Sequence, residues 1–162
     1  MTEALVTAGS LVPAATPEAL EKIARVEEKM RAMPQIHLHT DHVLHAGMYA
    51  RTIRLAARVA ITSVLIKIPT VIIVHGKCTV FAGDEWRVLD GFNVIPASAG
   101  RKMIYVTASP TEITMVFPSN AKSVEEAERE FTDDAELLLS RQCKDDTITI
   151  TGVERGSELC QA

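Results

Sequence analysis

The stretch VIIVHGKCTVFAGD, residues 71–84, is typical of two short β-strands separated by a turn. Residues 71–75 and 77–82 are rich in β-branched and apolar side chains, and Gly76 and Gly83 mark the ends of the two runs. The same pattern continues on both sides, which adds expected strands at residues 48–55, 59–67, 85–89, 92–96, 102–107 and 111–117. Many short strands at this spacing, with no helical segment between them, predict a β-sandwich or barrel.

Composition limits the classes of function. The 162 residues are 47% hydrophobic, which suffices for the core of one domain and excludes global disorder. The formal net charge of -4 lacks the basic footprint of a protein that binds duplex nucleic acid. No apolar run reaches the roughly 20 residues of a membrane span, so we expect no membrane partner. The three cysteines form no C-x-x-C pair and are odd in number, which favours a reducing, cytoplasmic setting.

A helical pattern precedes the strands. Thr16-Pro17-Glu18 is a typical helix start, and Pro34 is a stop. Between them apolar residues follow a 4-3-4-3 spacing: Ala19, Ile23, Val26, Met30 and Met33. Such a helix either lies on its own domain or pairs across a subunit interface.

Helical patterns also follow the strands. Ser123 and Glu126 form a capping box that predicts a helix to about residue 131, and a second helix is expected from residue 135 to about 142. The glutamates of the first helix are expected to form one solvated face: Glu125, Glu126, Glu128 and Glu130. The β-prone residues 147–153 would add a strand to the sheet or to a neighbouring subunit.

These patterns divide the chain into four regions. We expect a flexible arm at residues 1–15, an N-terminal helix at 16–34, a barrel at 35–118, and C-terminal helices with a β-prone tail at 119–162. The fold class is therefore mainly β, with helices at both ends of the chain.

Gly76 in IVHGKCTVF and Pro96 in FNVIPASAGRK match positions of two motifs through which residues 48–117 resemble a cupin, a small jelly-roll barrel. The cupin motifs read G-x5-H-x-H-x(3,4)-E-x6-G and G-x5-P-x-G-x2-H-x3-N. The metal-binding His, His, Glu and His of these motifs fall here on Ser63, Leu65, Pro69 and Arg101. These side chains cannot supply the imidazoles and carboxylate that Zn, Fe or Mn needs. The resemblance thus implies a cupin-like barrel without its metal, and no other cofactor is expected.

The spacing H-x-x-H-x-G-x-Y-x-R at residues 42–51 carries a second resemblance. Together with the N-terminal helix and an acidic C-terminal helix, it is similar to small cupin-like proteins of tailed bacteriophages. If the gene is viral, the resemblance implies the host cytoplasm as the location and the sequestering of a host nucleotide signal as a use.

Four of the five histidines lie within residues 37–45. On a strand His37, His39 and Asp41 share one face, whereas His42 belongs to the other. Three interpretations stay open: a polar edge strand whose histidines bond to backbone and water, a metal site made of His37, His39 and His42, or histidines that contact a ligand.

Basic residues suggest a site for an anion. Ser98-Ala99-Gly100 would form a turn with free amides beside Arg101 and Lys102, and Arg101 would point into the barrel mouth. Arginine offers paired donors that fit phosphate or carboxylate. The predicted ligand-binding residues are Arg101, Lys102, Ser98, Tyr49, Arg51, Arg54, His42 and His45. Alternatively, these charges pair with Glu and Asp on the surface.

We therefore expect a metal-free, non-catalytic cupin-like protein that forms a homo-oligomer and binds a small anion, a nucleotide or a sugar phosphate. One alternative is a structural oligomer without a ligand. The other is a metal-dependent cupin enzyme that uses His37, His39 and His42.

Overall fold

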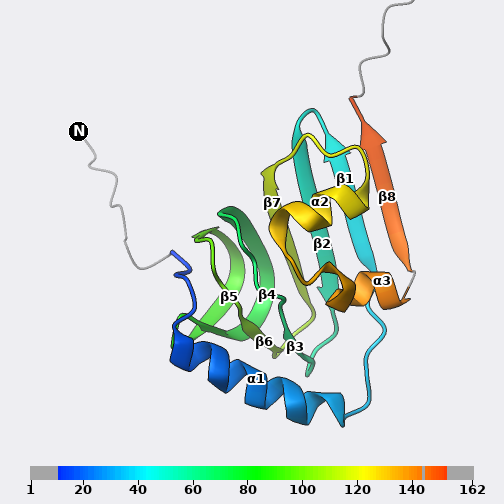
Figure 1. Ribbon diagram of the computed structural model, residues 1–162. Helices are drawn as coiled ribbons and strands as arrows, with labels where there is room; N and C mark the ends of the chain where they lie inside the picture. Colours follow the sequence, from blue (N-terminus) through cyan, green and yellow to red (C-terminus); the bar gives the residue numbers. More distant parts are fainter. Residues whose placement is uncertain (1–10, 144, 153–162) are drawn as a thin grey trace, which may run out of the picture.

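An eight-stranded sheet forms the centre of the molecule, and the computed structural model describes it within residues 11–143 and 145–152 (Figure 1). The strands follow the order β3-β6-β4-β7-β2-β1-β8, and β5 pairs with the other edge of β4. Their bounds are β1 Thr40–His45, β2 Met48–Leu55, β3 Ala60–Thr62, β4 Thr70–Ala82, β5 Glu85–Ala97, β6 Ile104–Thr107, β7 Thr111–Pro118 and β8 Asp146–Thr151. The predicted fold class, mainly β with helices at both ends, is confirmed.

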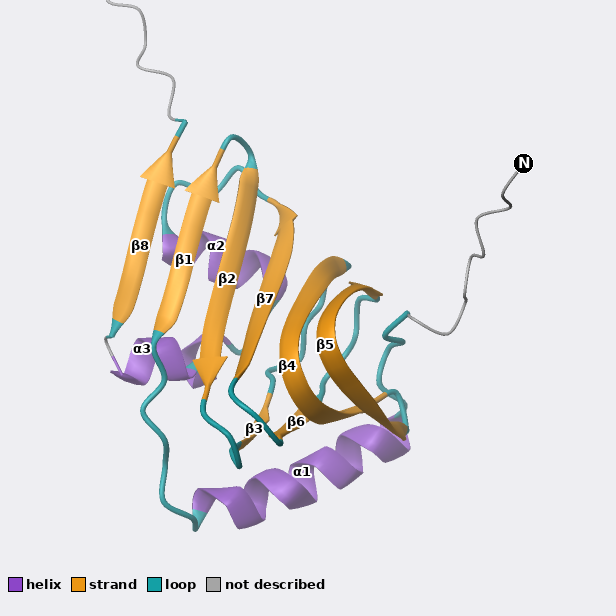
Figure 2. Ribbon diagram, turned by 180° about the vertical axis from the view of Figure 1, so that it is seen from behind, coloured by secondary structure: helices purple, strands orange, loops and turns teal. Residues whose placement is uncertain are grey.

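The sheet curls where β4 changes partners. The first half of β4 pairs with β7 and its second half with β6, while β5 follows β4 along all 13 residues. Gly76 lies at the change, with a φ of 135°, and a Cβ there would come within 2.6 Å of the Pro110 carbonyl oxygen. Figure 2 shows the bend in β4 and β5 beside the straighter strands β7, β2, β1 and β8.

The predicted turn at Gly76, and the break expected between the strands 85–89 and 92–96, are therefore wrong. Gly76 and Gly91 face each other inside the β4–β5 pair, so glycine here bends two long strands and does not end four short ones. Similarly, the strand expected at residues 59–67 shortens to β3, and Ile66 joins the sheet only through a single bridge to Arg101.

Helix α1 (Pro17–Arg31) lies along the end of the curled part of the sheet (Figure 1). Thr16 caps it, because its side-chain oxygen accepts the Ala19 N–H at 3.0 Å. Ala19 and Ile23 are fully buried against Phe81 of β4 and Ile104 of β6. The first half of the apolar seam is thus used within the chain, which favours a helix on its own domain.

The segment before α1 is also held in place. Val12 is buried, its N–H donates to the Pro96 carbonyl at 2.9 Å, and its carbonyl accepts from the Ser98 N–H at 2.9 Å. The predicted flexible arm is therefore wrong for residues 11–15, and the rest of it lies outside the described residues.

The C-terminal helices cover one face of β1 and β2 (Figures 1 and 2). Ser123 caps α2 (Val124–Phe131), as predicted, through the Glu126 N–H. The second expected helix is broken into a 3-10 turn, η2 (Ala135–Leu137), and α3 (Leu139–Cys143), because Leu138 between them is extended with a ψ of 128°. The β-prone tail forms β8, which pairs in parallel with β1 of the same chain, and Val153 lies outside the described residues.

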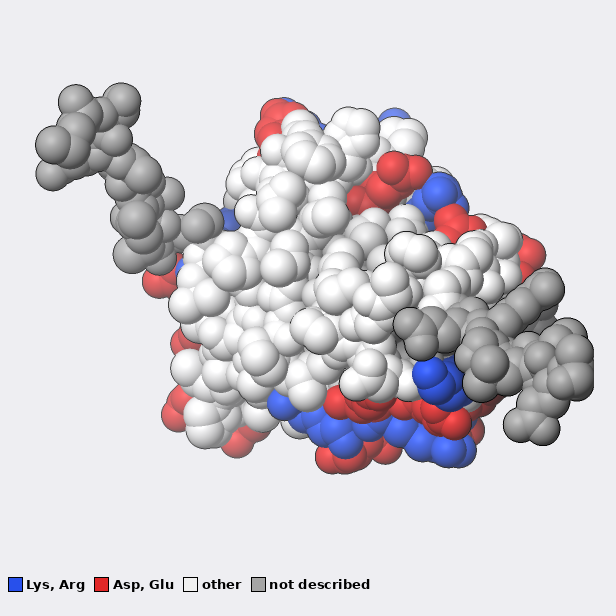
Figure 3. Space-filling model, turned by 90° about the horizontal axis from the view of Figure 1, so that it is seen from above, with Lys and Arg blue, Asp and Glu red and all other residues white. Residues whose placement is uncertain are grey.

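Figure 3 shows a broad area of the molecule's surface with few Lys, Arg, Asp or Glu side chains, and charged groups gather at its margins. Within the described residues, no helix has the length and apolar character needed to cross a membrane.

Candidate functional site

A cavity of about 130 Å³ lies between the inner face of the sheet and the C-terminal helices. Apolar side chains from β2, β3, β4 and β7 line one side, and Phe131 with residues 137–139 lines the other. Among this apolar lining stand two arginines, Arg51 from β2 and Arg101 from the loop before β6.

Arg101 is only 2% exposed. Its Nη1 donates to the carbonyls of Ile68 and Ser98 at 3.1 and 3.0 Å, and its Nη2 contacts the Thr70 hydroxyl at 2.6 Å and the Met115 sulfur at 3.5 Å. Burial lowers the pKa of Arg101 to about 10, so it is charged at neutral pH. Every acceptor here is neutral, and the described residues place no carboxylate in an ion pair with it.

Arg51 lines the same cavity, and it is paired in register with Met115 across β2 and β7. Its Nη2 donates to the Ser140 hydroxyl at 3.1 Å, and its buried Nε has no hydrogen-bond partner among the described residues. Burial lowers the pKa of Arg51. The structure thus brings together two of the predicted residues, Arg51 and Arg101, that lie 50 positions apart in the sequence.

Behind Arg51, Glu128 is buried at 1% exposure, which corrects the expectation of a solvated face. Its carboxylate accepts from Arg141 Nε at 2.6 Å and from the Ser140 hydroxyl at 3.3 Å. The signal was in the spacing, because Glu128 shares a helix face with the buried residues Val124 and Phe131.

The predicted residues His42 and Tyr49 are buried in this layer but do not line the cavity. His42 Nδ1 lies 2.8 Å from the Tyr49 hydroxyl, and its Nε2 lies 3.4 Å from Asp146 of β8. Burial lowers the pKa of His42, which favours the neutral imidazole. His45 lies farther along β1, 2.8 Å from the Thr151 hydroxyl, and is also outside the cavity lining.

Lys102 and Arg54 point elsewhere, contrary to the prediction of one cationic edge. Lys102 forms an ion pair with Glu27 of α1 at 2.7 Å. Arg54 lies on the outer face of β2, where it pairs with Asp41 and with Glu112 at 2.9 Å. Both cations therefore have carboxylate partners, as the surface alternative anticipated.

The Ser98 turn also differs from the prediction. The N–H of Ser98 donates to Val12, and those of Gly100 and Arg101 both donate to the Ile66 carbonyl. These amides are therefore used within the protein and do not face an anion.

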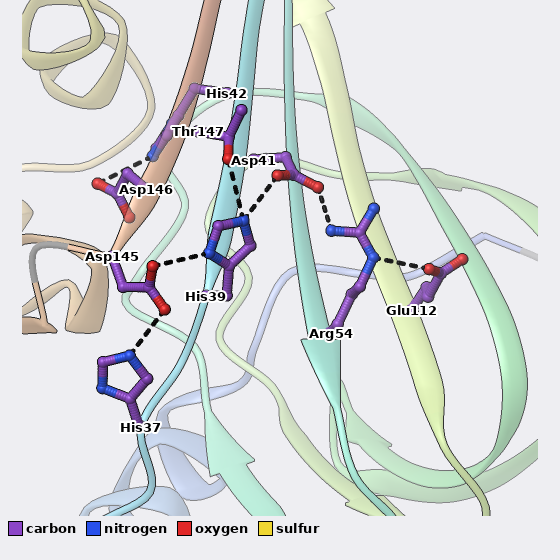
Figure 4. Close-up of polar contacts among 9 residues, drawn as sticks. All are labelled: His37, His39, Asp41, His42, Arg54, Glu112, Asp145, Asp146 and Thr147. Atoms are coloured by element: carbon purple, nitrogen blue, oxygen red, sulfur yellow. Dashed lines mark hydrogen bonds and ion pairs between the residues drawn. The ribbon is translucent and has the colours of Figure 1, made fainter.

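His37 and His39 form a polar ladder with Asp41 and Asp145 on the outer face of the sheet, which we call the outer ladder (Figure 4). His37 and His39 share Asp145 at 2.8 and 3.2 Å, and His39 also lies 2.9 Å from Asp41. His42 points to the inner face of the sheet, so the three histidines of the metal alternative do not converge. In the part of the chain that the structure describes, no group of three His, Cys, Asp or Glu side chains could hold a metal ion.

A second cavity of about 350 Å³ lies between β4, β5 and Val12. Its cation, Arg87, donates to the Leu11 carbonyl at 3.1 Å and lies 3.9 Å from Glu85. Because this charge has a carboxylate near it, the smaller cavity is the stronger candidate for an anion.

Neither protein-family models nor curated proteins match this chain. Similar solved structures include a cupin domain of an Enterobacter cloacae transcriptional regulator, at 18% identity and a TM-score of 0.39 over 44% of this chain and 83% of that one. Ectoine synthase from P. lautus is 15% identical, with a TM-score of 0.45, over 60% of this chain and 75% of that one. A cupin-domain protein from Shewanella frigidimarina is 13% identical, with a TM-score of 0.41, over 61% of this chain and 97% of that one. This likeness concerns the fold alone, and the resemblance to bacteriophage proteins stays a prediction.

Proposed function

We propose that the protein binds a small anionic molecule in the cavity between Arg51 and Arg101. One observation carries the proposal: two guanidinium groups line one largely apolar cavity, and among the described residues neither forms an ion pair with a carboxylate. The sequence suggested nucleotides and sugar phosphates as ligands, and both belong in the test.

The physical reason is the cost of an uncompensated charge. Neutral carbonyls and hydroxyls solvate the Arg101 guanidinium in part, but a charge away from water is stabilised far better by an opposite charge. An anion that enters the cavity would supply that charge and would accept from Arg51 Nε, whose N–H has no partner in the described residues. Binding is the expected role, because the lining supplies cations and apolar groups and no nucleophile with an adjacent base.

The test is thermal unfolding of the full chain with inorganic phosphate, AMP, ribose 5-phosphate and short carboxylates. A ligand that binds only the folded protein at 100 times its Kd stabilises it by about 2.7 kcal/mol. We expect at least one anion to raise the Tm of the parent protein and to lose this effect in Arg101→Met.

Arg54→Met is the matched control, because it removes an arginine from the outer face and leaves the cavity unchanged. It should retain the ligand-induced rise in Tm. The proposal is wrong if no anion stabilises the parent, or if Arg101→Met responds as the parent does.

We also propose self-association, because β5 presents a free edge with large exposed apolar side chains. In the described part of the chain β5 pairs only with β4 and, at its end, with Val12. Its large exposed apolar residues are Trp86, Val88, Phe92 and Val94.

A further inference from the structure

We infer that the ligand is a monocarboxylate with a short, branched apolar body, which would lie with its carboxylate between Arg51 and Arg101. This inference rests on the proposed function and narrows it to one chemical class. Size, lining and charge of the cavity each support it.

The size of the cavity excludes the larger anions. At about 130 Å³ it is close to the roughly 150 Å³ of an engineered cavity that takes up benzene. Sites for drug-sized ligands measure about 300–1,000 Å³. The cavity therefore fits a molecule of about five carbons and not a nucleotide.

The lining excludes a polar body. Away from the arginines, the wall is formed by aliphatic side chains such as Ile53, Ile61 and Ile72, together with Leu138. Ser63 and Thr62 contribute hydroxyls at one side. The several hydroxyls of a sugar would lose their water against the aliphatic part of this wall and gain few partners, whereas a branched alkyl chain would gain apolar contact.

The charges favour a single negative group. Arg51 lies beside a buried layer that contains Arg141, Glu128 and Asp146, and these four side chains carry two positive and two negative charges. Arg141 also pairs with Glu136, but that carboxylate is 83% exposed and is screened by water. Arg101 has no carboxylate in an ion pair among the described residues and is left as one surplus cation. A monoanion balances this charge, and one oxygen of its carboxylate can accept from Arg51 Nε, whose N–H has no partner among the described residues.

Isothermal titration of the full chain with isovalerate tests the inference against matched probes. Isovaleramide has the same shape without the charge, N-acetyl-leucine adds an amide that the cavity cannot hold, and ribose 5-phosphate and AMP represent the polar anions. We expect isovalerate to bind at least tenfold more tightly than each of the four.

The outcomes separate the two proposals. If ribose 5-phosphate, AMP or inorganic phosphate binds through Arg101 and isovalerate does not, the inference is overturned and the proposed function stands. Binding of N-acetyl-leucine at the affinity of isovalerate would overturn the size argument. If isovalerate and isovaleramide bind equally, or no anion binds, both proposals fall.

Cavity variants keep the test falsifiable if Arg101→Met does not fold. Arg101→Lys retains the charge and loses the planar pair of donors, so isovalerate should bind about tenfold more weakly. Ile61→Ala lengthens the cavity and should shift preference from isovalerate towards 4-methylpentanoate. An unchanged preference in a folded Ile61→Ala protein would show that the apolar body lies elsewhere.

Discussion

At the scale of single residues, Glu128 shows how position decides the role of a charge. Arg141 pairs with two carboxylates, the buried Glu128 at 2.6 Å and Glu136 at 2.7 Å, whose side chain is 83% exposed. The two ion pairs share one guanidinium and differ in burial. They form a matched pair for experiment.

We expect Glu128→Ala to lower the free energy of unfolding by about 3–5 kcal/mol, because it leaves Arg141 and Ser140 without their buried acceptor. Glu136→Ala should cost less than about 1 kcal/mol, because water screens an exposed pair. Urea unfolding of both variants measures the difference. Equal costs would mean that the Glu128 pair is open to water.

Arg101 shows what a sequence can and cannot reveal about a site. The motif comparison predicted that it points into the barrel mouth, and the structure buries it in the wall of the cavity. Arg51, the second arginine of the cavity, was only one of several candidates in the sequence. It comes near Arg101 because the register of β2 and β7 sets it opposite Met115, and a sequence does not show that register. Lys102 follows Arg101 in sequence, but it points to Glu27 because neighbouring residues leave the backbone in different directions.

At the scale of elements, strand existence was predictable and strand continuity was not. The expected strands 48–55 and 111–117 agree with β2 and β7 within one residue. The sequence pattern predicted two short strands in place of each of β4 and β5, because glycine usually marks a turn between strands. Here Gly76 and Gly91 lie within one long strand pair and bend it. The break at Leu138 has no sequence signal, since leucine favours helix.

Strand β8 pairs with β1 through the backbone, and the outer ladder adds side-chain contacts at the start of β8, so its attachment should depend on pH. Asp41 and Asp145 raise the pKa of His39 above 6.5, and the partners of each carboxylate, Arg54 for Asp41 and His37 for Asp145, lower the pKa values of both acids below 3.8. The stabilisation that protonated His39 gives to the attachment of β8 is complete below pH 6.5 and is lost as pH rises through the raised pKa of His39. The stabilisation that the carboxylates of Asp41 and Asp145 give is present above pH 3.8 and is lost as pH falls through their lowered pKa values.

We therefore expect β8 to be most protected between pH 3.8 and 6.5 and less protected at pH 8.5. Hydrogen exchange at Ile148 and Ile150, given as protection factors, measures this. His39→Gln should remove most of the change between pH 5.5 and 8.5. His42 on the inner face is common to both proteins, so its effect cancels in the comparison. Identical pH profiles for the two would contradict the role of His39.

At the scale of the whole molecule, strands β5 and β8 each lie at an edge of the described sheet, and the two edges differ. β8 carries three threonines and Asp146 beside two isoleucines, Ile148 and Ile150, whereas β5 exposes two aromatic rings and two valines. The helix seam that first suggested an oligomer is partly used within the chain, at Ala19 and Ile23. The homo-oligomer therefore stays a prediction, and β5 becomes its expected interface.

Two β5 strands can pair edge to edge about a two-fold axis, because an antiparallel pair of identical strands is self-complementary. Phe92 is 69% exposed and Val88 68%, and pairing would set side chains of the second β5 strand beside them and cover part of their apolar surface. We expect light scattering to show a dimer or a larger oligomer for the parent and a single chain for Phe92→Asp. Ile148→Asp on the opposite edge is the control, because that side chain is also exposed, at 53%, and should leave the oligomer intact. A single-chain mass for the parent at micromolar concentration would refute self-association, and dissociation by Ile148→Asp alone would place the interface at β8.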